Sequence, residues 1–144
     1  MKIAFACDHA GFSRKAGLME YLRNKGHEIT DLGCYSSEAS DYPDYGHLLA
    51  EHVASGKSDL GISLCGSGNG INMTANKHQE IRSAICWNPE IARLAKSHNN
   101  ANVIAIPARF VSANEAELIA DSFLNASFEG GRHQRRIDKI PIKK

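Results

Sequence analysis

Short apolar runs alternate along the chain with segments in which apolar residues recur every three or four positions. The apolar runs have the length of buried strands, and they are residues 2–8, 27–33, 59–65, 82–87 and 102–107. The first helical pattern consists of Phe12, Ala16, Met19 and Leu22 and stops at Gly26. Because parallel strands are joined by crossover connections, this alternation predicts a parallel sheet with helices on both faces.

Capping residues predict where two of the later helices begin. Asn88-Pro89 supplies a cap and a proline at the first helical position, and Ser112 and Glu115 have the spacing of a capping box. A short helix is expected over 71–78. Three further apolar helix faces are expected. The first consists of Leu48, Leu49 and Val53 and ends before Gly56, the second consists of Ile91, Leu94, Ala95 and His98, and the third consists of Ala116, Ile119, Ala120 and Phe123.

Length and composition indicate one soluble globular domain. The chain has 144 residues, of which 42% are hydrophobic and 23% charged. The apolar stretch before Asp8 is too short for a signal peptide or a membrane span, so we expect a cytoplasmic protein without a membrane partner. Its four cysteines form no metal-type pair, so neither disulfides nor structural zinc are expected.

Charge is unevenly distributed, although the net charge is only +1. From Arg132 onward there are six basic residues and one acid, whereas the first 131 residues carry 11 bases and 15 acids. A nearly neutral protein is a poor candidate for nucleic-acid binding. For the last lysines, Lys143 and Lys144, a solvated tail is an equal alternative to a function.

Ligands of parallel sheets bind beyond the carboxyl ends of the strands. Three polar segments are expected there, namely "CDHAG" at 7–11, "CGSGNG" at 65–70 and the stretch around Arg109. The glycine loop is no dinucleotide fingerprint, because Ile71 stands where the third glycine belongs, and no Walker lysine follows it. The pattern therefore predicts no nucleotide cofactor.

The glycine loop has a chemistry of its own. Glycines allow several backbone N–H groups to point at one anion, and the helix that follows adds its positive dipole end. The same field would favour the thiolate form of Cys65 and make this group able to exchange protons. From the residues alone, a buried thiol at the end of a strand is the favoured explanation of Cys65.

Six segments together carry a resemblance: "ACDHAG", "DYPDY", "CGSGNGI", "ANKHQEIRSAICW", "SHNNANV" and "GGRHQRRIDKI". In this order, over nearly the whole chain, they resemble the type B ribose-5-phosphate isomerases and the related galactose-6-phosphate isomerase subunits. The resemblance implies a Rossmann-like αβα fold with a five-stranded parallel sheet. It also implies interconversion of ribose 5-phosphate and ribulose 5-phosphate in the pentose phosphate pathway, through a cis-enediolate and without metal or cofactor.

The resemblance assigns the proton-transfer groups. Cys65 corresponds to the catalytic base, and Ser67 to a residue that helps to pass protons between the substrate oxygens. In another branch of the family a glutamate follows the last glycine and replaces the cysteine, but this chain has Ile71 there. The backbone amides expected to bind the enediolate are those of Gly66, Ser67, Gly68, Asn69 and Gly70.

Sugar and phosphate contacts are also implied by the resemblance. His98 corresponds to the ring-opening histidine, Asp8 to a group that assists it, Tyr42 to a sugar contact and Asn99 to a residue beside the enediolate. The residues expected at the phosphate are Arg132 and Arg136 on one helix face, His9 and Arg109. From the residues alone, His98 also suits a core-facing position and the arginines suit an exposed surface.

Family membership further implies a homodimer with two shared active sites, or a tetramer that contains it. Residues 131–144 would then contribute to the site or to the dimer. A six-carbon substrate, such as allose 6-phosphate or galactose 6-phosphate, remains an alternative, because its phosphate lies only one carbon-carbon bond farther away. The other alternative is a sugar-phosphate binding module without turnover.

Overall fold

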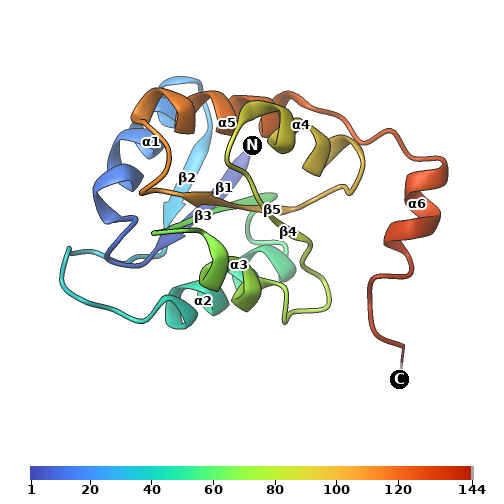
Figure 1. The fold of residues 1–144 in the computed structure, drawn as a ribbon, viewed down its shortest axis with the longest axis horizontal. Coiled ribbons are helices and arrows are strands. Elements are labelled where there is room, and N and C mark those ends of the chain that lie inside the picture. The colour runs from blue at the N-terminus through green and yellow to red at the C-terminus, as the bar shows by residue number, and fades with distance from the viewer. Residues whose placement is uncertain (144) are drawn as a thin grey trace.

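The computed structural model describes residues 1–143, which form the predicted five-stranded parallel sheet (Figure 1). Its strands are β1 (Lys2–Cys7), β2 (Glu28–Asp31), β3 (Leu60–Cys65), β4 (Ser83–Ile85) and β5 (Val103–Pro107). Their order is β2-β1-β3-β5-β4, and every neighbouring pair is parallel. The predicted fold class is confirmed. Lys144, part of the predicted basic segment, lies outside the described residues.

Helices cover both faces of the sheet (Figure 1). They are α1 (Phe12–Asn24), α2 (Tyr42–Ala54), α3 (Asn69–Ala75), α4 (Pro89–Ser97), α5 (Ala113–Asn125) and α6 (Arg132–Ile137). The connections from β1 to β2 and from β4 to β5 run in one direction along the sheet, so right-handed crossovers place α1 and α4 on one face with α5. The connections through α2 and α3 run the other way and cover the opposite face.

Local hydrogen bonds fix the helix starts that the sequence predicts. Asn88 Oδ1 accepts from the Ile91 N–H at 2.9 Å, and Ser112 Oγ accepts from the Glu115 N–H at 3.1 Å. The helix expected over 71–78 instead begins at Asn69 and ends at Ala75. It begins earlier because the Gly68 carbonyl already accepts from the Asn72 N–H at 3.2 Å.

Two predicted helix faces are wrong in part. Ala16 is exposed in α1 and Leu48 is 47% exposed in α2, whereas both were expected in the core. An alanine methyl group is too small to decide which face is buried, and larger side chains three or four positions apart prevail. The residues that α1 buries are Lys15, Leu18, Met19 and Leu22.

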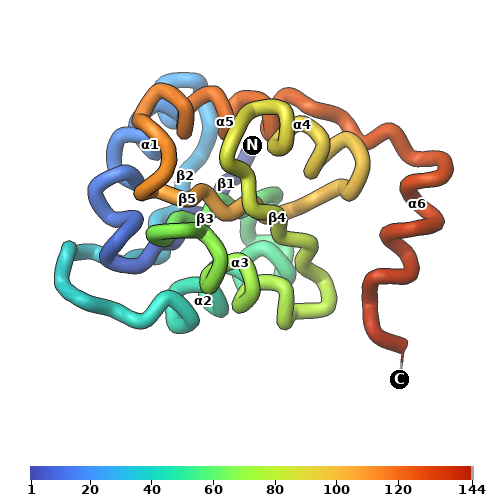
Figure 2. Tube along the Cα trace, viewed as in Figure 1, coloured from blue at the N-terminus to red at the C-terminus, as the bar shows by residue number. Residues whose placement is uncertain are grey.

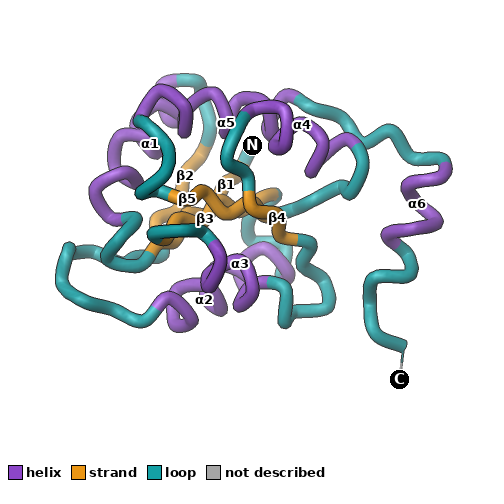
Figure 3. Tube along the Cα trace, in the orientation of Figure 1, coloured by secondary structure: helices purple, strands orange, loops and turns teal. Residues whose placement is uncertain are grey.

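Lys15 is a buried cation in the otherwise apolar layer beneath α1. Only 1% of this residue is exposed, and its Nζ forms an ion pair with Asp31 and donates to the Cys34 carbonyl at 2.7 Å. It thereby joins α1 to the end of β2 and to the long loop that leads to α2, drawn in teal in Figure 3. The loop ends at Tyr42, so Lys15 anchors the chain that delivers a predicted site residue.

The C-terminal helix stands apart from the layered body, beyond the β4 edge of the sheet (Figure 2). Of its residues, only His133 and Ile137 are buried. The chain after it returns to the body where the Ile142 N–H donates to Gln79 Oε1 at 3.3 Å. A cavity of about 530 Å³ lies there, lined by Ile140 and Ile142 among others. None of the helices within residues 1–143 is long and apolar enough to cross a membrane.

We expect Lys15→Met to destabilise the protein by about 2–3 kcal/mol, because it removes one partner of a buried ion pair; Asp31 still reaches solvent, which limits the loss. The matched control is Lys25→Met, since Lys25 pairs with Asp121 at the surface and should contribute far less. Urea unfolding of both variants measures the difference. Equal losses would contradict the anchoring role of Lys15.

Candidate active site

The predicted site residues form two groups, one at the carboxyl ends of the strands and one at their amino ends, and we call these the carboxyl edge and the amino edge of the sheet. The cysteine-loop group, Asp8, His9, Tyr42, residues 65–70 and Arg109, lies at the carboxyl ends of β1, β3 and β5. The histidine group, His98, Asn99, Arg132 and Arg136, lies where α4 ends and α6 begins. Because α4 runs back against the strands, its end reaches the amino edge, where the Gly61 N–H donates to the Asn102 carbonyl at 2.9 Å. One chain therefore brings each group together but keeps the two groups apart.

Cys65 is buried at the last position of β3, with 4% of the residue exposed. Its Sγ accepts a hydrogen bond from the Gly68 N–H at 3.1 Å. Gly68 has a φ of 80°, in the left-handed region that glycine adopts without strain, and this turns its amide toward the sulfur. The thiol is therefore buried, as one sequence interpretation held, and also faces a donor that stabilises negative charge, as the other held.

Two glycines of the loop leave room for predicted ligand-binding side chains. A Cβ at Gly66 would lie 3.1 Å from Arg109 Nη1, and one at Gly70 would lie 2.5–2.7 Å from three ring atoms of Tyr42. The Arg109 N–H also donates to the Gly66 carbonyl at 3.1 Å. The absence of side chains at these positions thus brings a guanidinium and a phenol ring against the loop.

Ser67 and Asn69 are exposed at the tip of the loop. Ser67 Oγ accepts from the Asn69 N–H at 3.3 Å and from Asn69 Nδ2 at 3.1 Å. These bonds use the lone pairs of the hydroxyl oxygen, so its own proton is free to point outward. The hydroxyl therefore still has its own proton to donate.

Asp8 and His9 follow β1 at the same edge. Asp8 is 6% exposed, and its Oδ1 accepts from the Ala10 and Gly11 N–H groups at 3.0 and 3.2 Å. His9 Nδ1 lies 3.1 Å from the Ser40 nitrogen and 3.2 Å from the Ser40 carbonyl oxygen. A backbone amide can only donate, so we assign Nδ1 as the acceptor and Nε2 as the protonated atom. Both side chains line a cleft of about 490 Å³ that also includes Tyr42.

Two other cysteines are chemically different from Cys65. Burial raises the pKa of Cys86 to about 12, and burial is also the main reason that the pKa of Cys7 is raised to about 12. The Cys7 sulfur lies 3.8 Å from that of Cys34 and faces another thiol rather than a backbone amide. These buried thiols remain protonated near neutral pH.

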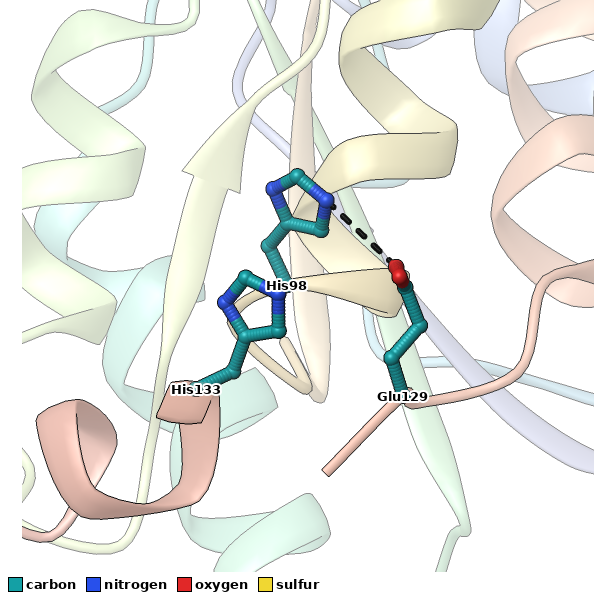
Figure 4. A group of neighbouring side chains, drawn as sticks. All are labelled: His98, Glu129 and His133. Carbon is teal, nitrogen blue, oxygen red and sulfur yellow. Dashed lines mark ion pairs between the residues drawn. The ribbon is translucent and has the colours of Figure 1, made fainter. Parts of the chain in front are cut away.

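His98 caps the end of α4, and its side chain is 39% exposed. Its Nε2 lies 3.4 Å from Glu129 Oε2, and its ring stacks on the His133 ring at 4.3 Å between centroids with 14° between planes (Figure 4). The sequence analysis missed both partners. Glu129 directly precedes the motif "GGRH", and His133 lies within it, so the motif was the available signal.

Three side chains of metal-ligand type meet here, since atoms of His98, Glu129 and His133 all lie within 4.8 Å of one another. A metal ion binds an imidazole nitrogen along its lone pair, in the plane of the ring. The two rings are nearly parallel, so no point close to both nitrogens lies in both planes (Figure 4). The geometry suits an ion pair between the Glu129 carboxylate and the His98 imidazole better than a chelated ion.

Asn99 and the turn around it are held by a residue that the sequence analysis also missed. Arg82 Nε donates to the Asn99 carbonyl at 3.0 Å, and Arg82 Nη2 donates to the Asn100 carbonyl at 2.9 Å. Asn100 has a φ of 44°, in the left-handed region that asparagine tolerates better than most residues. The guanidinium thus fixes the turn, while the Asn99 residue stays exposed.

Arg132 and Arg136 are exposed on α6, one helical turn apart. Neither forms an ion pair with a residue among 1–143. Burial, Arg132, His98 and Arg136 all contribute to lowering the pKa of His133, with burial the largest cause. The helix therefore carries two cations that no acid among residues 1–143 pairs with.

This layered parallel α/β fold carries proton-transfer side chains, backbone donors and exposed arginines. These are the groups that an enzyme acting on a sugar phosphate requires. Residues 3–140 match the Ribose/Galactose Isomerase family, and the chain belongs to this family. The resemblance seen in the sequence is thereby confirmed.

Three relatives illustrate how close this membership is. Ribose-5-phosphate isomerase B of Escherichia coli K12 is 45% identical over 139 residues, which are 96% of this chain and 93% of that protein. The crystal structure of a ribose 5-phosphate isomerase from Thermotoga maritima matches with a TM-score of 0.96 and 48% identity over 97% of both chains. Ribose-5-phosphate isomerase B from Mycoplasma genitalium, solved with bound ribulose 5-phosphate, matches with a TM-score of 0.93 and 45% identity over 96% of this chain and 93% of that one.

Cys65 should react with iodoacetamide at pH 8 well before Cys7 and Cys86, because alkylation consumes thiolate. With a pKa of about 12, Cys7 and Cys86 are ionised to only about one part in ten thousand at this pH. Peptide mass spectrometry over time measures the order, and the unfolded protein, in which all four thiols react alike, is the control. Labelling of Cys86 as fast as Cys65 would contradict the assignment.

Proposed function

We propose that this protein is an aldose-ketose isomerase that interconverts D-ribose 5-phosphate and D-ribulose 5-phosphate in the pentose phosphate pathway. The observation that carries the proposal is Cys65 Sγ beside the Gly68 N–H, at the ligand-binding edge of a sheet in this isomerase family. The relative from Mycoplasma genitalium was solved with bound ribulose 5-phosphate, which supports this substrate.

The isomerisation step needs a base between C2 and C1 and donors for the intermediate. Cys65 as thiolate removes the proton from C2, the electron pair forms the cis-enediolate, and the thiol returns the proton to C1. Of the loop amides from Gly66 to Gly70, those of Gly68 and Asn69 donate to Cys65 Sγ and Ser67 Oγ. The other three, at Gly66, Ser67 and Gly70, stabilise the negative charge on the oxygens, at about 3 kcal/mol for a well-placed donor. Ser67, whose oxygen accepts from Asn69 and whose own proton is free for a ligand, passes a proton between O1 and O2. No step requires an external cofactor.

Ring opening precedes isomerisation, because ribose 5-phosphate exists largely as a furanose. His98 donates a proton to the ring oxygen as the bond from this oxygen to C1 breaks. Asp8 accepts the proton of the C1 hydroxyl through Oδ2, which makes no hydrogen bond within residues 1–143. An aldehyde is the product, and Tyr42 and Asn99 hold its hydroxyl groups.

The phosphate is bound by the cations at both ends of the site. Arg132 and Arg136 present two planar guanidinium groups from one helix face, and His9 and Arg109 approach from the cysteine-loop group. Arg132 and Arg136 have no acidic partner among residues 1–143, and a phosphate dianion would neutralise their charges. The glycine loop thus serves the enediolate, and the arginines serve the phosphate.

Each active site is shared by two copies of the chain in a homodimer. The two groups lie at opposite edges of one sheet, so the cysteine-loop group of one copy and the histidine group of another complete a site. A two-fold axis produces two such sites, and a tetramer would contain two such dimers. Each chain acts as one domain over 1–144, in the cytoplasm, with residues 131–144 contributing to the site or to the dimer.

A six-carbon sugar phosphate is the second candidate substrate, because the family's description covers galactose as well as ribose isomerases. It would use the same proton-transfer groups with its phosphate displaced by one bond. Steady-state kcat/KM for ribose 5-phosphate, allose 6-phosphate and galactose 6-phosphate ranks the candidates. We expect ribose 5-phosphate to have the highest value.

Cys65→Ala should abolish isomerisation while binding of ribose 5-phosphate persists, because it removes the base but leaves the phosphate cations. The expected loss in kcat is at least about 10²–10⁴. A coupled assay and calorimetric titration measure the two properties. Cys86→Ala is the control, since it removes a buried thiol that no step uses. Full activity of Cys65→Ala contradicts the role of Cys65. If the wild-type protein itself binds ribose 5-phosphate but does not convert it, the protein is a binding module.

Co-expression of Cys65→Ala with His98→Asn should restore activity that neither variant has alone. Each mixed dimer then contains one site with both native side chains, so random pairing restores about a quarter of wild-type activity. Co-expression of Cys65→Ala with Cys65→Ser is the control and should restore none. If the first pair also stays inactive, both groups act within one chain.

A further inference from the structure

Backbone hydrogen bonds of Glu129 and of the residue after it hold this segment against His98. The Glu129 N–H donates at 3.0 Å to the carbonyl of Ser97, the residue that precedes His98. The next residue, Gly130, accepts at 3.1 Å from the N–H of His133, whose ring stacks on His98. Figure 4 shows the carboxylate at the edge of the His98 ring and His133 against its face. The segment therefore positions a carboxylate and a flat ring around one imidazole.

We propose that Glu129 is a positioning residue that holds His98 as the tautomer with its proton on Nε2, and that Nδ1 is the nitrogen that exchanges a proton with the sugar ring. This inference rests on the proposed role of His98 in ring opening.

The argument follows from what each atom can donate. Nε2 is the imidazole nitrogen that faces the Glu129 carboxylate, in an ion-pair contact of 3.4 Å, and the negative charge favours a proton on this nitrogen over one on Nδ1. Nδ1 makes no hydrogen bond to any residue among 1–143, so it is the nitrogen left for a ligand. The side chain of His98 is 39% exposed, so a ligand can reach it.

The proton balance of ring opening is consistent with this tautomer. Protonated His98 gives its Nδ1 proton to the ring oxygen, which takes the electron pair of its bond to C1, while Asp8 accepts the proton of the C1 hydroxyl. The imidazole left behind already has its remaining proton on Nε2, against Glu129. It needs neither a ring flip nor a tautomer exchange before the next turnover, because the carboxylate holds the same nitrogen throughout.

His133 supports the face of the His98 ring without competing for its proton. The pKa of His133 is lowered, mainly by burial and next by Arg132, so this ring stays neutral near pH 7. A neutral ring can stack on a protonated imidazole without charge repulsion. The other charged groups around the pair come from α4 and α6, and they are Glu90, Arg93, Arg132 and Arg136.

The kinetic test compares a cyclic substrate with an acyclic one. Erythrose 4-phosphate cannot close a furanose ring, because its C4 oxygen carries the phosphate, yet its isomerisation needs the same proton transfer between C2 and C1. We expect Glu129→Ala to lower kcat/KM for ribose 5-phosphate about tenfold, which is less than the 10²–10⁴ of a whole acid-base group, and to spare erythrose 4-phosphate. Glu129→Gln retains an accepting oxygen and should lose less.

Two controls separate this role from a general one. Glu90→Gln removes a nearby exposed carboxylate that pairs with Arg93 rather than with His98, and it should leave both substrates unaffected. Cys65→Ala should lose activity on ribose 5-phosphate and on erythrose 4-phosphate by the same factor. Because half of the Glu129 side chain is exposed, its truncation should not unfold the protein, which the melting temperature checks.

Nitrogen-15 NMR of histidine-labelled protein at about pH 8.5 reads the tautomer directly, with the His98 signals assigned by their loss in His98→Asn. We expect the proton on Nε2 in the wild type and in Glu129→Gln, and a mixture of tautomers in Glu129→Ala. The proposal is overturned if Glu129→Ala keeps the wild-type tautomer, or if it slows both substrates by the same factor. If the wild type isomerises neither substrate, the proposed function is wrong, and the NMR result still decides what Glu129 does to His98.

Discussion

The parallel direction of all five strands is the constraint on which the rest of this structure depends. Every strand ends at one edge of the sheet, and every connecting helix must return to the other edge before the next strand begins. Cys65 ends a strand and His98 ends a helix, so the two side chains lie at opposite edges. The same topology that places the thiol beside the Gly68 amide therefore keeps the His98 imidazole of that chain away from it.

Close approach of backbone and side chains governs the cysteine-loop group. Gly68 takes a backbone conformation that turns its amide onto the sulfur, and Gly66 and Gly70 leave space that Arg109 and Tyr42 occupy. Substituting any of the three glycines would alter a contact with a candidate substrate-binding group. The loop thus packs against the end of β3, the segment after β5 and the start of α2, and it also supplies hydrogen-bond donors.

Electrostatics organises the opposite edge in a different way. Arg132 and Arg136 lie exposed on a short helix that contributes only two buried residues, so their charges stay available to an anion. Glu129 faces the imidazole rather than the arginines, and His133 is kept neutral by burial. The carboxylate therefore faces the imidazole, whereas the two arginines face solvent without an acidic partner among residues 1–143.

Sequence alone determined the strands, the helix caps and the family, because these depend on residues at most a few positions apart or on motifs read in order. The caps of Asn88 and Ser112 each involve an amide three residues away. Tertiary structure alone decided that Ala16 faces solvent, that Lys15 pairs with Asp31 and that Glu129 meets His98 across 31 positions. Such contacts depend on how crossovers bring distant segments together, and no local spacing encodes that.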